Sequence, residues 1–281
     1  MQALADFIAQ YPRLLVLTGA GLSATSGIPV YRDKSGTWLR TTPVQHNDFI
    51  NKAASRQRYW ARSMVGWPRM AQSSPNAGHL ALVKMEEAGF IDLLVTQNVD
   101  CLHQRAGHRN VIDLHGSLDR VHCLDCHAVL PRALMQQWLQ EANPTLVNPL
   151  AEMRPDGDAD LADELIAGLT IPSCPHCGGI LKPDVVFFGG TVPRSRVDAV
   201  NQALQRSDAL LVVGSSLTVF SGFRFCRDAH QLGKPIAVLN QGVTRADDLL
   251  TLKIEEDCAE GLSELLKLIE TTDCGSGPCP R

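Results

Sequence analysis

The chain has 281 residues, of which 44% are hydrophobic and 20% are charged, and these fractions are ordinary for a globular protein. Its 26 basic and 30 acidic residues give a net charge of -4, which argues against general binding to nucleic acids or anionic membranes. No apolar run approaches the roughly 18 residues that span a bilayer, and the N-terminal segment lacks the basic start of an export signal. We therefore expect a soluble, cytoplasmic α/β protein with one large domain and a smaller one attached.

Short apolar runs that end in polar or glycine-rich clusters recur along the chain. They predict strands over 14–17, 93–95, 111–114, 210–213 and 236–239. Amphipathic patterns between these runs predict helices over 79–89, 197–208 and 259–270. Strands alternating with helices are typical of a doubly wound parallel sheet, in which ligands bind outside the carboxyl ends of the strands. We therefore expect the polar clusters to converge on one edge of a Rossmann-like sheet.

A glycine-rich sequence follows the first expected strand. Residues 19–24, GAGLSA, match G-x-G-x-x-[G/A], a pattern whose backbone amides approach a pyrophosphate. In the continuation TSGIP, Gly27 and Pro29 would end a long first helix. The acidic residue that holds the ribose in dehydrogenases, about 20 positions later, is absent. The pattern indicates a bound nucleotide, but not the arrangement used for hydride transfer.

Four other strand ends carry polar residues. The stretch VTQNVDCLHQRAG (95–107) crowds hydrogen-bonding side chains together, and His115 follows the next strand. An imidazole with a pKa near 6.5 can serve there as a general base, although a lone histidine is more often structural. GSS (214–216) and NQG (240–242) are placed to bind ribose hydroxyls and phosphates, or are ordinary loop residues. The shared edge favours the functional interpretation.

Two cysteine pairs predict a structural zinc ion. The four ligands would be Cys123, Cys126, Cys174 and Cys177. Four sulfurs fill a tetrahedral coordination sphere and leave no position for a reactive water. Nine cysteines without an export signal also favour metal binding over disulfides. Adjacent histidines are alternative ligands that we favour less: His122, His127 and His176.

Several segments interrupt the alternation of strands and helices. Residues 41–78 predict a helical insertion, and 119–183 contain the cysteine pairs and an acidic loop at 154–164. Residues 182–189 (KPDVVFFG) predict an extended edge that could pair with an incoming peptide, or one more core strand. We expect a Rossmann-like domain from 1–40, 79–118 and 184–270, a small domain from 41–78 and 119–183, and a disordered tail at 271–281.

Together these motifs resemble the sirtuins, NAD-dependent protein lysine deacylases. The resemblance covers roughly residues 12–268 and rests on GAGLSATSGIP, TQNVD, LHGS, the cysteine pairs, KPDVVFFG, GSSL and LNQG in that order. It implies a Rossmann-like domain with a zinc-ribbon and helical module, NAD and one zinc ion as cofactors, and acyl-lysine proteins or peptides as partners. RQRYWARSMVGWP, RPDGD and CLDC look closest to the class II branch of the mitochondrial lipoamidase and ADP-ribosyltransferase type, and the lack of a presequence suggests a bacterial member. We expect a monomer that does not bind nucleic acid or membranes.

The resemblance also implies roles for individual residues. Catalysis would depend on His115 as general base and on Asn98. The residues that would bind NAD are Gly19, Ala20, Gly21, Ser23, Ala24, Ile28, Pro29, Tyr31, Arg32, Gln97, Asn98, Val99, Asp100, Gly214, Ser215, Ser216, Asn240, Gln241, Gly242 and Cys258. The residues that would bind the substrate are Tyr59, Arg62, Val186, Phe187, Phe188 and Gly189.

The chain departs from the family pattern at two positions. Val30 stands where the family usually has an acid, and Gly190 stands where it often has Glu or Asp. Tyr59 and Arg62 share a helix face, as in the branch that binds acidic acyl chains, but Arg62 could equally be a solvated arginine. Competing functions are mono-ADP-ribosyl transfer with the same NAD site and a non-catalytic nucleotide- or zinc-dependent interaction module.

Overall fold

The computed structural model describes residues 1–30, 43–144, 166 and 168–273. Its main sheet has six parallel strands in the order β3-β2-β1-β7-β8-β9. They are β1 (Leu14–Thr18), β2 (Ile91–Thr96), β3 (Val111–Asp113), β7 (Ala209–Val213), β8 (Ile236–Leu239) and β9 (Leu252–Ile254). From β1 the chain builds outward to β3, then returns to the other side of β1 for β7 to β9. This reversal places the switch point of the sheet between β1 and β7.

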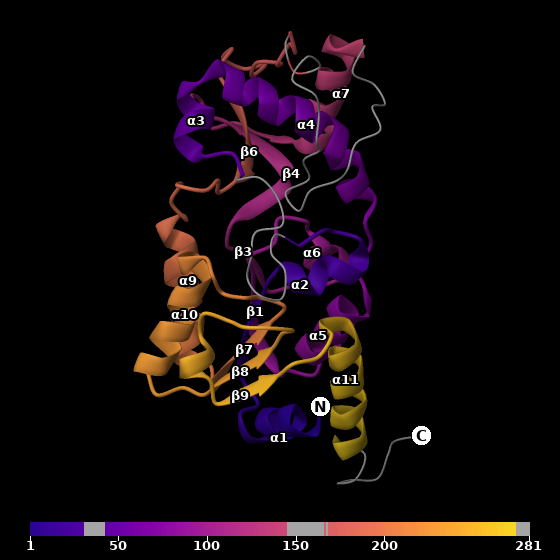
Figure 1. Cartoon of the computed structure of the whole chain (residues 1–281), viewed down its shortest axis with the longest axis vertical. Helices are drawn as coiled ribbons and strands as arrows, with labels where there is room; N and C mark the ends of the chain where they lie inside the picture. The colour runs from indigo at the N-terminus through magenta and orange to yellow at the C-terminus, as the bar shows by residue number, and fades with distance from the viewer. Residues whose placement is uncertain (31–42, 145–165, 167, 274–281) are drawn as a thin grey trace.

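Helices cover both faces of this sheet, because successive residues of each strand point to opposite sides. Leu14 and Val16 face a core shared with α1 (Gln2–Gln10), α5 (Ala77–Glu87) and α11 (Cys258–Asp273). Leu15 and Leu17 face a second core shared with α9 (Arg194–Arg206) and α10 (Phe220–Gln231). Figure 1 shows α9 and α10 on one side of the strands and α5 and α11 on the other. The predicted α/β class with a doubly wound sheet is confirmed.

A smaller antiparallel sheet lies at the other end of the molecule (Figure 1). Its order is β5-β4-β6, with β4 (Gly116–Cys123), β5 (Val129–Pro131) and β6 (Leu181–Val185). The predicted insertion forms α3 (His46–Asn51) and α4 (Ala53–Gln72), which share a core with this sheet and α7 (Arg132–Ala142). β6 is an edge strand, as predicted for the start of 182–189. The exact division of the chain into domains stays a prediction.

Short elements follow the strand ends that approach the site. After β1 come only α2 (Ala20–Ser23) and the 3₁₀ turn η1 (Ala24–Ser26), which ends at Gly27 with φ 82°. The prediction that no long helix follows this strand is confirmed. After β2, α6 (Leu102–Ala106) is similarly short, and η3 (Asp247–Leu249) precedes β9.

Some predictions fall at the edge of the described residues or beyond them. Tyr31, Arg32 and the acidic loop at 154–164 lie outside them. The tail was predicted to start at 271, but α11 continues to Asp273, where the Thr271 hydroxyl donates to the Leu268 carbonyl. Within the described part of the chain, no helix combines the length and apolarity needed to cross a bilayer.

Candidate active site

A cavity of about 750 Å³ opens at the carboxyl ends of β1, β2, β7 and β8, around the switch point. Most of the residues predicted to bind NAD or substrate line it. These are Gly19, Ala20, Gly21, Ala24, Tyr59, Gln97, Asn98, Val99, His115, Val186, Phe187, Phe188, Gly189, Gly214, Ser215, Ser216, Asn240, Gln241 and Cys258. The two departures from the family pattern, Val30 and Gly190, also line it.

Other predicted residues that the structure describes are not in the cavity lining. They are Ser23, Ile28, Pro29, Arg62, Asp100 and Gly242. For Asp100 and Ser23 the reason is visible. Their side chains hydrogen-bond to each other at 2.7 Å, and both residues are buried. Asp100 also accepts from the Leu102 backbone, so it braces the loops behind the cavity.

The glycine-rich loop is packed directly against the end of β7. The Gly21 amide donates to the Gly214 carbonyl at 2.8 Å. Gly214 has φ +64°, and a Cβ there would lie 2.4 Å from the Leu22 backbone nitrogen. Only glycine permits this approach. The contact joins the two loops on either side of the switch point into one rim of the cavity.

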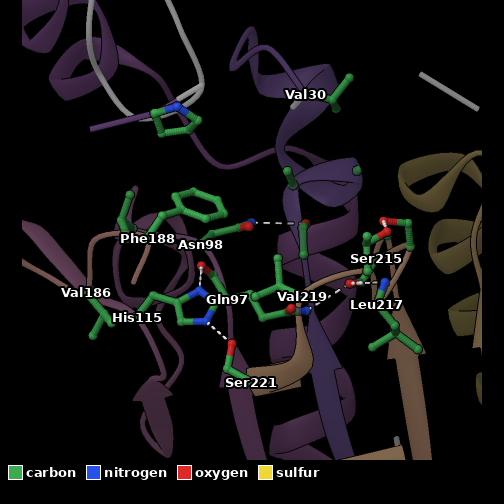
Figure 2. Close-up of a pocket in the computed structure, with 18 of the residues that line it drawn as sticks. Val30, Gln97, Asn98, His115, Val186, Phe188, Ser215, Leu217, Val219 and Ser221 are labelled. Atoms are coloured by element: carbon green, nitrogen blue, oxygen red, sulfur yellow. Dashed lines mark hydrogen bonds between the residues drawn. The ribbon is translucent and has the colours of Figure 1, made fainter. Parts of the chain in front are cut away.

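Gln97 and Asn98 tie three strand ends together. The Asn98 side-chain amide donates to the Gly19 carbonyl and to the Ser23 hydroxyl, both at 3.0 Å. The Gln97 amide donates to the Ser215 hydroxyl at 2.9 Å. The ends of β1, β2 and β7 are therefore linked by side chains that also face the cavity (Figure 2).

His115 lies between β3 and β4, with its ring in the cavity wall (Figure 2). Its Nδ1 is 2.9 Å from the Gln97 carbonyl oxygen. A carbonyl can only accept, so Nδ1 carries the proton and Nε2 carries the lone pair. Burial lowers the pKa of His115, an effect opposed by the bond to Gln97 and reinforced by the charge of Arg196. The ring is therefore neutral at pH 7 and able to accept a proton.

The segment after β6, residues 186–189, lies next to His115 and forms the wall of the cavity opposite the glycine-rich loop. The Val186 amide donates to the His115 carbonyl at 2.7 Å, and the Phe188 carbonyl accepts from the His46 amide at 2.8 Å. The rings of Phe187 and Tyr59 lie 5.2 Å apart and pack edge to face. The wall is apolar. It contacts α3 through His46 and α4 through Tyr59.

The four predicted cysteines meet at one point. Their sulfurs all lie within 4.8 Å of one another, with Cys123 and Cys177 3.5 Å apart and Cys126 and Cys174 3.7 Å apart. A zinc ion with bonds of about 2.3 Å separates its sulfur ligands by about 3.8 Å. A disulfide would need about 2.05 Å. The group fits one tetrahedral zinc ion and contains no histidine.

The start of α10 also lines the cavity, and sequence reasoning missed it. The additional residues are Thr218 and Val219, directly before the helix, and Phe220, Ser221 and Arg224 within it. They directly continue the GSSL motif (214–217), whose strand-end position was the one available signal. Ser221 places its hydroxyl 2.7 Å from Nε2 of His115.

Comparison with known proteins places this geometry in a family. The profile of the Sir2 family matches residues 19–221. This chain belongs to the Sir2 family. An NAD-dependent protein deacetylase from Xanthomonas axonopodis pv. citri (strain 306) is 55% identical over 262 residues, covering 93% of this chain and 89% of that protein. The human mitochondrial NAD-dependent protein lipoamidase sirtuin-4 is 49% identical over 273 residues, covering 96% and 86%.

Solved structures agree with this membership of the Sir2 family. A complex of Sir2 with a p53 peptide and NAD⁺ superimposes with a TM-score of 0.77 at 27% identity, covering 96% of this chain and 99% of that one. A complex of a Sir2 homologue with NAD has a TM-score of 0.75 at 29% identity, covering 97% and 94%. The predicted resemblance is confirmed at the level of family and fold.

Proposed function

We propose that this chain removes acyl groups from protein lysine side chains with consumption of NAD, using His115 as the general base. The protein is an NAD-dependent protein deacylase of the Sir2 family. The observation that carries the mechanism is the orientation of His115. His115 lies in the wall of a cavity bounded on one side by the glycine-rich loop and on the other by residues 186–189, and its unprotonated Nε2 is the nitrogen able to accept a proton. The general base, the candidate nucleotide site and the segment that would bind the peptide thus line the same cavity.

The cavity fits NAD in size and lining. Its volume of about 750 Å³ lies within the usual range for cofactor sites. The backbone of Gly19 to Gly21 supports binding of the pyrophosphate, and Gln97 and Asn98 support binding of the nicotinamide half. Residues at the ends of β7 and β8 support binding of the adenosine half: Ser215, Ser216, Asn240, Gln241 and Cys258.

NAD, as co-substrate, supplies a ribose carbon from which neutral nicotinamide can leave. The acyl-lysine carbonyl oxygen takes its place, and the nicotinamide ribose then reacts through its 2′-hydroxyl. His115 acts at this second stage: the hydroxyl proton passes to Nε2 while the Gln97 carbonyl holds Nδ1–H. General-base assistance of this kind contributes roughly 10²–10⁴-fold. Water then attacks the acyl carbon and the lysine amine leaves, so that free lysine, nicotinamide and O-acyl-ADP-ribose are the products.

The substrate is an acyl-lysine in a protein or peptide. The extended segment from Val186 to Gly189 lines the cavity, and this position supports its pairing with the backbone of the substrate peptide. Tyr59 lines the cavity and would contact the acyl chain, whereas Arg62 lies outside the lining. Recognition of acidic acyl chains by Arg62 stays a prediction, as do a monomeric state and a cytoplasmic location.

The zinc ion would be held by Cys123, Cys126, Cys174 and Cys177 and would act structurally. Two of these cysteines are buried and two are exposed; the end of β4 and the turn after it supply the first pair, and the segment before β6 supplies the second. Four sulfur ligands leave no position for water. The ion would stabilise the small sheet, and through Val186 it would position the wall opposite the glycine-rich loop.

The proposal is tested by incubating the protein with NAD and peptides that carry acetyl-, lipoyl- or glutaryl-lysine, with product masses as the readout. We expect at least one peptide to give free lysine and O-acyl-ADP-ribose in equal amounts. A peptide that instead gains an ADP-ribosyl group would establish the competing transferase activity. No NAD consumption with any peptide would contradict both activities and favour the interaction module.

A further inference from the structure

Ser221 is hydrogen-bonded to the nitrogen of His115 that has to accept the proton. Its Oγ lies 2.7 Å from Nε2, and Figure 2 shows the ring held between this hydroxyl and the Gln97 carbonyl. Because Nδ1 already carries the ring proton, the Ser221 hydroxyl is the donor and Nε2 is the acceptor. Both ring nitrogens are therefore fixed, one by the end of β2 and one by the start of α10.

The start of α10 is held in place independently of this hydrogen bond. Gly222 follows Ser221, and a Cβ at Gly222 would lie 2.3 Å from Oε1 of Gln97. The absence of a side chain lets the helix pack directly on Gln97, the residue whose carbonyl binds Nδ1. The same close contact therefore sets the distance between Ser221 and His115.

We propose that Ser221 is a positioning residue for the general base and stabilises it in both protonation states. Before the reaction the hydroxyl donates to the single lone pair of Nε2 and holds the ring in place. For the transfer, the Ser221 side chain rotates away and the ribose hydroxyl takes its place at this lone pair; the ribose O–H bond breaks and an Nε2–H bond forms on His115. After the ribose oxygen has moved away to attack, the Ser221 hydroxyl returns and accepts from Nε2–H, while the Gln97 carbonyl continues to accept from Nδ1–H. No other reactant is needed, since the proton leaves later with the products.

This inference rests on the proposed function, and a comparison of two steps tests it. Release of nicotinamide precedes the step that needs His115, so it can be followed alone by exchange of labelled nicotinamide into NAD in the presence of acyl-peptide. We expect Ser221→Ala to lower kcat for deacylation by about 3- to 10-fold, the effect of one lost hydrogen bond, and to retain exchange. Equal losses in both steps, or unchanged deacylation, would overturn the proposal.

A matched control separates the loss of the hydrogen bond from the general effect of replacing a serine in the first turn of a helix. Ser195 is the second residue of α9, as Ser221 is of α10, and it is exposed. Ser195→Ala should change neither deacylation nor exchange. If the unmodified protein shows neither reaction, the proposed function fails; if it shows both and Ser221→Ala matches it, only the role of Ser221 fails.

A second measurement requires no turnover. The side-chain ¹⁵N spectrum of His115, assigned with His115→Ala, should show a protonated Nδ1 and an unprotonated but hydrogen-bonded Nε2 in the free protein. In Ser221→Ala the Nε2 resonance should shift toward the position of a free lone pair, while Nδ1 stays protonated. An Nε2 resonance that is the same in both proteins would overturn the proposal.

Discussion

Acid should weaken the fold through three histidines that are clustered behind the end of β1. The rings of His79 and His103 lie 4.9 Å apart, and those of His103 and His108 lie 5.1 Å apart. All three residues are buried, and His103 Nε2 lies 2.8 Å from the Thr18 hydroxyl. Among the residues that the structure describes, the carboxylate bonded to this histidine cluster is that of Glu86, which lies 2.9 Å from His108 Nδ1. A proton added to His108 would be partly compensated by Glu86, whereas a proton added to His79 would be poorly compensated.

The size of the effect follows from the pKa of His79. Burial, assisted by the nearby His108, lowers this pKa from 6.5 to about 4. Burial also lowers the pKa values of His103 and His108, the latter partly offset by Glu86. The unfolded chain therefore binds protons first, so the contribution of these histidines to stability is constant above about pH 6.5 and falls as the pH drops toward 4. His79 alone should cost about 2 kcal/mol at about pH 5, a large share of a typical folding free energy.

Urea unfolding at about pH 7 and about pH 5 measures this loss. His79 accepts from the Asn76 amide in a capping box, and His79→Gln keeps an acceptor at that position while removing the titration. We expect the variant to lose about 2 kcal/mol less than the unmodified protein between the two pH values. His230→Gln, which removes an exposed histidine on α10, should change nothing. Equal losses in the unmodified protein and His79→Gln would refute the reasoning.

Further predictions concern the site and the metal. His115→Ala should lower deacylation by about 10²-fold or more with zinc content and fold retained, and near-normal turnover would remove His115 as the base. Because burial lowers the pKa of His115, and the base must be neutral to act, kcat should be flat above about pH 6.5 and fall only below it. An acidic limb centred above pH 7 would contradict this. Cys174→Ser, at a buried ligand position, should abolish zinc binding measured by mass spectrometry and lower the melting temperature; retention of one zinc per chain would contradict the four-sulfur site. On the hypothesis that Arg62 pairs with acidic acyl chains, Arg62→Met should lower kcat/KM for glutaryl-lysine relative to acetyl-lysine. An unchanged ratio would reject that hypothesis and agree with the position of Arg62 outside the cavity lining.

Much of the main sheet was predictable because buried parallel strands are short continuous apolar runs. All five predicted strands are present, with ends shifted by no more than two residues. β9 was missed because LKI has a lysine in the middle and only three residues. The local sequence was sufficient to predict strands whose side chains are buried on both faces of the sheet. It was insufficient for β9, which forms a strand because it pairs with its neighbour β8.

The candidate site was predictable at the level of loops, and less so for individual side chains. Asp100 and Asn98 look equivalent in sequence, but only Asn98 lines the cavity. Cys101 adopts φ 61°, and the turn directs Asp100 to Ser23 instead. Ser221 was missed because its role depends on a helix that packs on Gln97 through Gly222, a tertiary contact with no local pattern.

The central claim, that the acyl group leaves lysine by way of the NAD ribose, is tested most directly with water enriched in heavy oxygen. In the proposed reaction the original acyl oxygen moves to the ribose carbon, and water completes release at the acyl carbon. We therefore predict O-acyl-ADP-ribose with one heavy oxygen, located in its acyl group. Heavy oxygen found in free carboxylate, or on the ribose carbon of ADP-ribose, would show simple hydrolysis of the substrate or of NAD and would contradict the mechanism.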